Sequence, residues 1–439
     1  MPKSFSLLMD TRIVQGAPLF ESLEPRQLLS AAPLTEPAYL GADHVAVPAQ
    51  QAKLAAQAPA AISASPSAKK LAAKLRTKKV AGADGPIVIT HGGVYSGTWQ
   101  SLNANVPAVQ VRTSEPVIIQ NSTIYSRGSC IDVYGVRGNV TVRNVKGYGM
   151  NPNIRGRYPG RFLDVDGFTN IVAENNYMEN TSGIYIYNYQ GNHTAAQTVK
   201  VRYNWCKNVD GRVSNGKGGW IAGPPNPDYY RQFFQINGVH NIVGGEVAWN
   251  QIINEQGNSR VEENINIHNT TGTKAAPFQI HDNYIQGAYA ANAVDARTYT
   301  GGGIMTSDNG SSYIKVFNNQ IVATGHIGIT ITSGHDNAFY NNRIVSDGKL
   351  PNGKWDPDSN TGAVIWNFNN ERTFKNNTAS GNMIGWVRKG QRADYWIPDG
   401  KFVNNKDWPG KITPATEYNE LLLWQKKLAD YHIAVGPNF

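Results

Sequence analysis

A short motif, one or two Asn residues followed by an apolar pair, recurs along most of the chain. It occurs in ENNYMENT from Glu174, WNQIINEQ from Trp249, HDNYIQGA from His281, NNQIVATG from Asn318 and NNRIVSDG from Asn341. We take the last Asn of each copy as an anchor, and successive anchors lie 23 to 46 residues apart. The anchors are Asn144, Asn176, Asn204, Asn250, Asn283, Asn319, Asn342 and Asn377. A period of this length indicates a solenoid, in which one structural unit is stacked repeatedly along an axis.

Short strands with alternating apolar residues fill each repeat. Examples are FLDVDG from Phe162, GIYIYN from Gly183, ENINIHN from Glu263 and, directly before an anchor, VKVRYN from Val199. Three such strands per repeat predict an all-β chain that forms a right-handed parallel β-helix, a three-sheet solenoid of about 9–10 coils. Asn tolerates left-handed backbone angles, and its amide can bond the Asn of the next coil, so we interpret the anchors as structural.

Residues 86–390 carry this pattern, and they resemble the pectate-lyase-like superfamily of right-handed parallel β-helices. That superfamily includes polysaccharide lyases, polygalacturonase-type hydrolases, epimerases, phage tailspikes and non-enzymatic adhesins, so the resemblance implies a fold more than an activity. In TGHIGITI, Ile327 stands where the Gly-His-Gly of polygalacturonases has its second Gly. The other polygalacturonase signatures and the calcium-and-arginine set of pectate lyases are not found in the sequence.

The first 85 residues have a different composition. LFESLEPRQLLSA, residues 19–31, resembles the Leu-Glu-Pro-Arg-x-Leu-Leu segment near the start of many planctomycete exported and surface proteins. This resemblance implies export to the extracellular space or the cell surface. Residues 31–83 are rich in Ala, Pro, Gln and Lys, which is typical of a flexible linker. We therefore expect residues 1–85 to be a disordered export and tether segment that can be removed without destabilising the rest.

The pattern fades after Gly390, so residues 391–439 are predicted to be a C-terminal extension. Within it, residues 415–433 have helical periodicity. The predicted apolar face consists of Tyr418, Leu421, Leu422, Leu428 and Tyr431. A solenoid must cover its terminal coil, so we expect this helix to cap the end or to pack on the flank.

Charge and cysteine content exclude several classes of protein. The net charge is +9, but the body after residue 85 is only mildly basic and has no aromatic–basic motif, so nucleic acid is not expected as a partner. No apolar run is long enough for a transmembrane segment. Cys130 and Cys206 are the only cysteines, and the anchors place them more than two coils apart, so no disulfide is expected. We expect a monomer.

Long spacings between anchors indicate insertions at residues 205–232, 251–263, 284–302 and 345–362. All leave the same corner of the coil, and stacked they would form a wall beside one sheet over the middle coils, which predicts a groove. The predicted catalytic residues are Glu255, Arg260, Glu262 and His268. The predicted substrate-binding residues are Asp210, Arg212, Asn237, Asn266, His281, Asp282, Asp308, His326, His335 and Asp336. Asp295 and Arg297 lie in one of the insertions.

Glu262 is the predicted general acid, because it adjoins the floor of the groove and Glu263 beside it should raise its pKa. In a lyase, Arg260 or His268 would be the base. The alternative interpretation is that Glu and Arg in such loops form salt bridges that hold the loop down, and that His residues serve in turns or ladders.

A second group of polar residues lies on the preceding coils. Asp132, Asp164 and Asp166, with Tyr134, Tyr185 and Tyr187, should point outward on successive strands. Three carboxylates with tyrosines suit calcium or sugar stacking, so calcium is a candidate cofactor and the three Asp residues are its candidate ligands. The alternative is a polar face stabilised by cross-strand pairs.

Two classes of function fit the sequence. The first is a secreted or cell-surface carbohydrate-active enzyme, a glycoside hydrolase or polysaccharide lyase, with a polysaccharide in the central groove. The second is a non-catalytic surface β-helix that binds glycan or has a structural or adhesin role.

Overall fold

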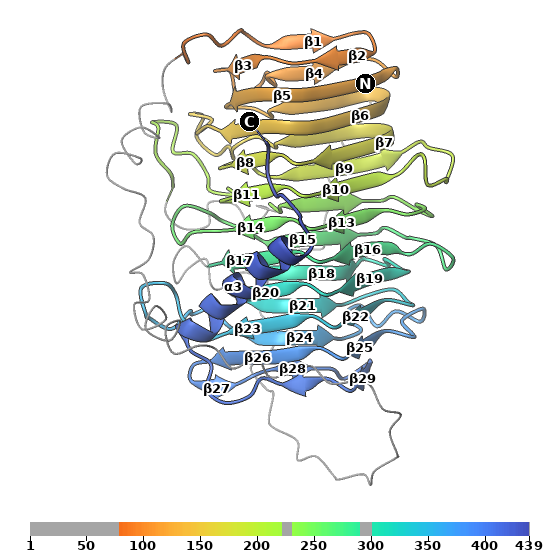
Figure 1. Cartoon of the computed structure of the whole chain (residues 1–439), viewed down its shortest axis with the longest axis vertical. Helices are drawn as coiled ribbons and strands as arrows, with labels where there is room; N and C mark the ends of the chain where they lie inside the picture. Colours follow the sequence, from red (N-terminus) through yellow and green to blue (C-terminus); the bar gives the residue numbers. More distant parts are fainter. Residues whose placement is uncertain (1–78, 222–230, 290–300, 439) are drawn as a thin grey trace. The chain divides into compact units, whose positions relative to one another are not determined.

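The computed structural model describes residues 79–221, 231–289 and 301–438. Their strands are stacked in coils from β1 at one end to β29 and β30 at the other (Figure 1). All pairings between successive coils are parallel, and each coil contributes one strand to each of three sheets. The right-handed parallel β-helix predicted from the sequence is confirmed. Within the described residues each sheet has eleven strands, slightly more than the nine or ten coils expected.

Sheet 1 is the sheet predicted to form the floor of the site. Its strands, in order along the axis, are β1 (Ile87–Ile89), β4 (Val109–Val111), the first part of β6 (Ile131–Gly149), the first part of β7 (Leu163–Glu174), β9 (Ile184–Tyr189), β12 (Phe234–Asn237), β15 (Glu263–His268), β18 (Gly302–Asp308), β21 (Ile327–Ile331), β24 (Thr361–Ile365) and β28 (Tyr395–Trp396).

Sheet 2 follows sheet 1 in every coil. It contains β2 (Gly93–Tyr95), the first part of β5 (Pro116–Ser126), the middle of β6, the second part of β7, β10 (Val199–Arg202), β13 (Glu246–Ala248), β16 (Phe278–His281), β19 (Ile314–Phe317), β22 (Ala338–Tyr340), β25 (Thr378–Ser380) and β29 (Lys401–Val403).

Sheet 3 closes each coil. It contains β3 (Thr98–Ser101), the second part of β5, the last part of β6, β8 (Tyr177–Glu179), β11 (Trp205–Lys207), β14 (Gln251–Ile253), β17 (Tyr284–Ala288), β20 (Gln320–Thr324), β23 (Arg343–Ser346), β26 (Met383–Arg388) and β30 (Lys406–Asp407). The short β27 (Gln391–Arg392) pairs with β26 in the antiparallel direction.

Inward-facing apolar side chains form one continuous core along the axis. On sheet 1, Leu163, Ile184, Phe234 and Ile265 occupy the same register position on successive coils, and all are fully buried. Because strands alternate inward and outward positions, the same register places the polar residues of these strands on the outer face. The core therefore fixes which side chains sheet 1 offers to solvent.

A ladder of Asn side chains runs along the turn between sheets 2 and 3. Each Nδ2 donates to the Oδ1 of the Asn on the next coil, at distances between 2.6 and 3.0 Å. The members are Asn176, Asn204, Asn250, Asn283, Asn319, Asn342, Asn382 and Asn405. The structural role expected for the anchors is confirmed for the six of them that belong to this ladder.

Two predicted anchors lie outside the ladder. Asn144 has a left-handed backbone with a φ of 50°, and the backbone N–H of Val145 after it donates to Asn176 at 3.0 Å. Asn377 accepts from the N–H of Asn337 at 3.1 Å, in a separate short row at the turn between sheets 1 and 2. In the coil of Asn377 the ladder residue is Asn382. The left-handed backbone angle and the ladder hydrogen bond belong to two neighbouring residues. Tyr203 and Trp249, which directly precede ladder residues, have φ values of 59° and 57°.

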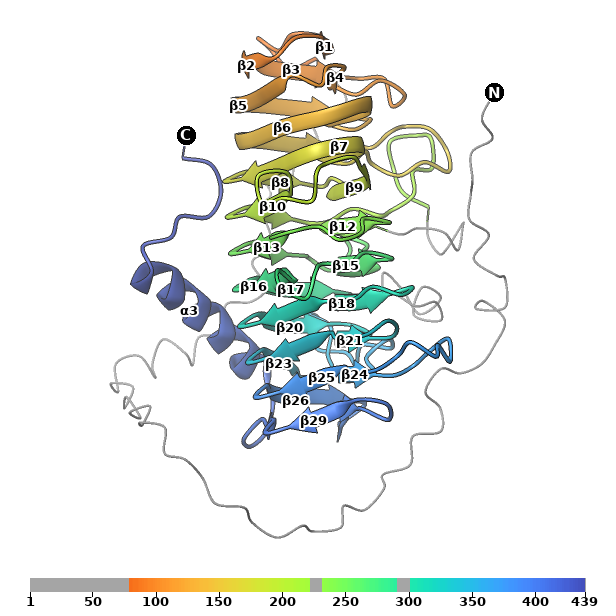
Figure 2. The same cartoon turned by 90° about the vertical axis from the view of Figure 1, so that its right-hand side faces the viewer.

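Helix α3 (Pro414–Asp430) lies against sheet 3, as the second view shows (Figure 2). It begins after Thr413, whose side chain caps it, and it packs on β20 and β23. The helix was expected to cap the end of the solenoid or to pack on its flank, and it packs on the flank. The predicted apolar face was wrong in part: Tyr418, Leu422 and Tyr431 are 41%, 43% and 65% exposed. The fully buried side chains of the helix are Glu420 and Trp424.

Three further expectations concern the N-terminal segment, the cysteines and membrane spans. Residues 1–78 of the proposed export and tether segment 1–85 lie outside the described residues, whereas its end contacts the first coil, where Asp84 bridges to Trp99 and Ala83 is 5% exposed. Cys130 and Cys206 are both free, as predicted, and both are buried. Among the described residues, no helix is both long and apolar enough to cross a membrane.

Candidate functional site

The outer side of sheet 1 brings together residues from both predicted clusters. Two columns of outward side chains run across its strands. The first contains Asp132, Asp164, Tyr185, Gln235, Asn266 and Met305, and the second contains Tyr134, Asp166, Tyr187, Asn237, His268 and Asp308. We call this surface, from β6 to β18, the sheet-1 face. The predicted groove residues and the second group of polar residues on the preceding coils therefore contribute to one surface.

Access to the sheet-1 face changes along the axis. At β6 Tyr134 is 57% exposed, whereas at β18 Met305 is only 7% exposed. Beyond the face, Thr330 on β21 and Val364 on β24 are each 1% exposed although they occupy outward positions. In the first column Gln235 at β12 and Asn266 at β15 are also buried, at 9% and 3% exposure, so a large ligand can reach the coils of β6 to β9 more easily than those that follow.

Glu262 lies at the edge of the sheet-1 face, directly before β15. The side-chain amide of Gln232, on the preceding coil, donates to Glu262 Oε2 at 2.6 Å. Burial raises the pKa of Glu262 well above its usual range, and the nearby charges of Glu263 and Asp308 raise it further. The contribution of Glu263 was predicted from the sequence. The carboxyl group therefore favours its protonated form, which is the form a general acid needs.

Two arginines lie beside this acid. Arg161 precedes β7, and its guanidinium stands 5.0 Å from the centre of the Tyr185 ring. Arg231 precedes β12 and stands 4.3 Å from the ring of Tyr158. Burial and then the charge of Arg231 lower the pKa of Arg161 to about 9, while Asp164 and Glu262 oppose this effect. Arg161 is still a cation at neutral pH, so the edge of the face combines a neutral acid with two positive charges.

A chain of hydrogen bonds crosses the second column. Asn237 Nδ2 donates to the hydroxyl of Tyr185 at 3.2 Å, and Asn237 Oδ1 lies 2.9 Å from His268 Nδ1. The other ring nitrogen, His268 Nε2, is 4.0 Å from Asp308 Oδ2. Burial raises the pKa of Asp308, although the charge of His268 opposes the shift. Tyr185, Asn237 and His268 come from β9, β12 and β15, so the fold aligns them on three successive coils.

The three candidate calcium ligands have other partners. Asp132 forms an ion pair with Arg112 at 2.7 Å, Asp164 accepts from Ser129 at 3.3 Å and Asp166 accepts from Asn188 at 3.2 Å. Across the described ranges, no group of three or more His, Cys, Asp or Glu side chains is arranged to hold a metal ion. These residues do not fit a calcium site.

Four of the predicted residues lie in contacts that hold the loops beside the face. Asp210 binds Arg212 through both carboxylate oxygens, at 2.9 and 2.8 Å, and Arg212 Nη1 donates to the carbonyl of Gly257 at 2.7 Å. Glu255 contacts Lys207 at 3.3 Å and accepts from Asn208 at 3.2 Å. Arg260 is 4% exposed, and its backbone forms an isolated parallel β-bridge with the backbone of Asp210. These contacts agree with the alternative interpretation, in which Glu and Arg side chains form salt bridges that hold the loops down.

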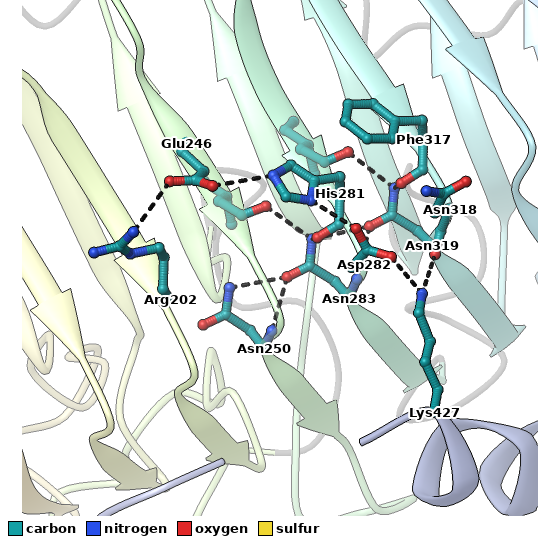
Figure 3. A network of polar contacts seen from close by, with 12 residues as sticks. Arg202, Glu246, Asn250, His281, Asp282, Asn283, Phe317, Asn318, Asn319 and Lys427 are labelled. Carbon is teal, nitrogen blue, oxygen red and sulfur yellow. Dashed lines mark hydrogen bonds and ion pairs between the residues drawn. The ribbon is translucent and has the colours of Figure 1, made fainter. Parts of the chain in front are cut away.

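His281 and Asp282 belong to sheet 2, on another side of the coil from Glu262. Figure 3 shows His281 between two carboxylates, with Nδ1 at 2.7 Å from Asp282 and Nε2 at 3.1 Å from Glu246. Lys427 of α3 reaches Asp282 at 2.5 Å. Burial lowers the pKa of His281, but the hydrogen bonds that these two carboxylates accept from its ring outweigh burial and raise the pKa above its usual value. This network joins α3 to sheet 2, so the structure separates it from the sheet-1 face.

The remaining predicted residues lie at two other corners. His326, directly before β21, contacts Asp358 at 2.9 Å. His335 contacts its neighbour Asp336 at 2.7 Å in the turn between β21 and β22. Asp295 and Arg297 lie outside the described residues. Of the predicted catalytic set, Glu262 and His268 are on the sheet-1 face, and Glu255 and Arg260 are in the loops beside it.

Sequence reasoning missed Arg161, Arg231 and Gln232 as members of this site. A signal was present, because all three stand two or three residues before a sheet-1 strand, as Glu262 does before the alternating part of ENINIHN. Aligning the strands coil by coil would have placed them on one edge.

The chain matches no protein-family model, and no curated protein gives a significant match. A search of solved structures finds a mannuronic acid specific polysaccharide family 6 lyase from human gut microbiota. The match covers 84% of this chain and 95% of that one, with 12% sequence identity and a TM-score of 0.37. No residue role is transferred from it.

Proposed function

We propose that the chain is an exported, carbohydrate-active β-helix protein that cleaves a polysaccharide bound across the sheet-1 face. The observation that carries the proposal is the position of Glu262. Its carboxyl group favours the protonated form, it is held by Gln232, and it lies beside Arg161, Arg231 and the hydrogen-bonded chain from Tyr185 to His268.

The dimensions of the face suit a polymer. Adjacent strands lie about 4.8 Å apart, so the six strands from β6 to β18 span roughly 24 Å. That length accommodates several sugar residues, whereas a small metabolite would contact only two or three coils. The outward Asp, Asn, His and Tyr side chains can hydrogen-bond sugar hydroxyls, and tyrosine rings can pack against the apolar faces of sugars.

The ionisable groups at the edge of the face are costly for stability. Burial disfavours the charged forms of Glu262, Arg161 and Arg231, and apolar residues at such positions would stabilise a solenoid at least as well. Perturbed acids and bases that gather on an accessible surface are typical of catalytic centres.

Glu262 would act as a general acid on the oxygen of the scissile glycosidic bond. In a hydrolase a second carboxylate on the face would act as base or nucleophile, and Asp164 and Asp308 are candidates in the two columns. In a lyase, a base on the face would instead remove a proton from a uronic acid.

A non-catalytic glycan-binding protein is the second candidate. The exposed ring of Tyr134, with Arg112 at 5.7 Å from its centre, favours it because such a pair can bind a sugar without cleaving it. In that case the face would retain glycan and release no product.

A screen of the purified protein against plant, algal and bacterial polysaccharides tests the proposal. Reducing ends should form with at least one polymer, and Glu262→Gln should lower turnover at least about tenfold, or roughly 1.4 kcal/mol of barrier. Glu174→Gln, which changes an ion pair with Arg202 on sheet 2, is the matched control and should keep full activity. Binding without any cleavage would replace the enzyme by the second candidate.

A further inference from the structure

We propose that Tyr185 is the residue that transfers the proton in a β-elimination on a uronate-containing polysaccharide, with Asn237 and His268 positioning its hydroxyl and Arg161 binding the uronate carboxylate. This inference rests on the proposed function and selects the lyase from its two chemistries. It adds a residue that the sequence placed only in a calcium or sugar-stacking cluster.

The hydrogen-bonded chain determines what the Tyr185 oxygen can do. His268 Nδ1 is 2.9 Å from Asn237 Oδ1, which turns the amide so that Nδ2 points at Tyr185, 3.2 Å away. The phenolic oxygen therefore accepts a hydrogen bond from a fixed donor. This bond fixes the position of the phenolic oxygen on the sheet-1 face.

Arg161 acts on the same ring from the other side. Its guanidinium lies 5.0 Å from the ring centre and is anchored by a hydrogen bond from Nη1 to the carbonyl of Ser182 at 2.7 Å. Tyr185 lies on β9 between Asp164 on β7 and Gln235 on β12, so a polymer on the sheet-1 face must pass it.

The charges around Tyr185 suit a carboxylate-bearing sugar. Arg161 and Arg231 flank Glu262, and an arginine guanidinium binds a carboxylate through paired hydrogen bonds. Burial raises the pKa of the nearby acids Glu262, Asp164 and Asp308, which weakens their competition for the guanidinium groups. Another nearby acid, Asp166, is held by Asn188 at 3.2 Å and by the hydroxyl of Tyr187.

The reaction balances with Tyr185 as the base and Glu262 as the acid. The Tyr185 phenolate removes the hydrogen on C5 of the uronate, whose acidity rises when Arg161 neutralises the carboxylate. The electron pair forms the C4–C5 double bond, and the bond between C4 and the glycosidic oxygen breaks. Glu262, the general acid of the proposed function, gives its proton to the departing oxygen, and water carries the proton from Tyr185 back to Glu262. No oxidant, reductant or second substrate is consumed.

The test uses the full chain with polymers of galacturonate, glucuronate and mannuronate, and it measures reducing ends and the absorbance of the unsaturated uronate together. The expected result is that both increase in parallel with at least one polymer. Tyr185→Phe keeps the ring beside Arg161 and should lower kcat at least about a hundredfold. Tyr340→Phe removes a tyrosine hydroxyl from the sheet-2 face and is the matched control.

The positioning roles of Asn237 and His268 are tested separately, by measuring kcat and KM. His268→Gln should lower kcat about tenfold and leave KM unchanged, because the orientation of the Tyr185 hydroxyl is lost while the sugar contacts remain. A thermal unfolding temperature equal to that of the wild type establishes that each variant is folded. If Tyr185→Phe unfolds, Asn237→Leu, which removes the same hydrogen bond to the hydroxyl, takes its place with the same expected loss.

Three outcomes would overturn the inference. Reducing ends without the unsaturated product would leave the proposed function intact and exclude elimination. Full elimination by Tyr185→Phe would assign the proton transfer to another residue. The absence of cleavage of every polymer in the wider screen would remove the proposed function and this inference with it.

Discussion

Gln232 Nε2 donates a hydrogen bond to Glu262 Oε2 at 2.6 Å, and the two residues stand on adjacent coils at the edge of sheet 1. This bond holds the Glu262 carboxyl group in one orientation toward the face. Gln232 is fully buried, so its position is fixed by the coil and does not depend on solvent. The general acid proposed here is therefore oriented by a residue on the neighbouring coil.

Replacing Gln232 by Met removes the donor and keeps most of the side-chain volume. We expect kcat on the identified polymer to fall about tenfold with little change in KM, because Glu262 can then rotate away from the scissile oxygen. Gln279→Met on sheet 2, where Gln279 is exposed, should leave both constants unchanged. A normal kcat in Gln232→Met would mean that Glu262 needs no orientation from this bond.

Helix α3 is attached to the coils by a buried charge. Glu420 is 1% exposed and receives Arg343 Nη2 at 2.7 Å, Arg343 Nε at 2.8 Å and Gln320 Nε2 at 2.9 Å. Glu420→Ala leaves these donors without their acceptor, which should cost about 3 kcal/mol of stability. Hydrogen exchange should become faster in residues 414–430, and unfolding in denaturant should start earlier.

The control for this change lies on the same helix. Lys426 and Asp430 form an exposed pair at 2.6 Å, and Lys426→Ala should cost no more than about 0.5 kcal/mol. Equal losses in Glu420→Ala and Lys426→Ala would contradict a specific role for the buried carboxylate.

The docking of α3 should also depend on pH. Burial, and then the charge of Asp347, raise the pKa of Glu417 from 4.5 to about 8. The folded protein thus keeps a proton that the unfolded chain releases above pH 4.5, so the contribution of Glu417 to the free energy of unfolding should be largest below that pH. It should decrease as the pH rises toward about 8.

Glu417→Gln isolates this effect, because its amide oxygen can still accept the N–H of Asp347 that binds Glu417 at 2.6 Å. The pKa values of His281 and Asp356 are raised too, so both residues also make the free energy of unfolding fall as the pH rises. The informative quantity is therefore the difference in the free energy of unfolding between wild type and variant. Denaturant unfolding from pH 4 to 9 should show the variant gaining stability relative to wild type with increasing pH. A difference that does not change with pH would contradict the assignment.

The fold could be predicted because its causes are local. Alternation in FLDVDG and GIYIYN places Leu163, Val165, Ile184 and Ile186 inward, and all four are fully buried. The Asn motif failed at Asn144 because an Asn with a left-handed backbone and an Asn in the ladder look alike in a short sequence window. Only the stacking of coils separates the two roles.

The helix face and the site depend on distant partners, and this limited their prediction. Glu420 is buried because Arg343, 77 residues earlier, pairs with it, and hydropathy alone places a Glu on the outside. Tyr185 and Asn237 are 52 residues apart yet bonded, because the insertion at 205–232 separates their strands in sequence but not in register. Glu255 and Arg212 carry the same residue types as a catalytic group, and only their contacts distinguish them.

The last prediction concerns the Asn ladder itself. Asn283 is fully buried, and its Oδ1 accepts from the N–H and the Nδ2 of Asn250, at 3.0 and 2.9 Å. Its Nδ2 donates to the carbonyl of Val247 and to Asn319 Oδ1, both at 2.9 Å. Asn283→Ala would leave several buried polar groups without partners at once, and each such group costs about 1–3 kcal/mol.

We therefore expect Asn283→Ala to lower the free energy of unfolding by at least about 3 kcal/mol. The matched control is Asn144→Ala, at an Asn of the same motif that lies outside the ladder. It should cost only the strain of placing Ala at a φ of 50°, about 1–2 kcal/mol. Denaturant unfolding followed by circular dichroism measures both variants. A loss in Asn144→Ala as large as that in Asn283→Ala would mean that the turn conformation, and not the ladder, is what the recurring Asn supplies.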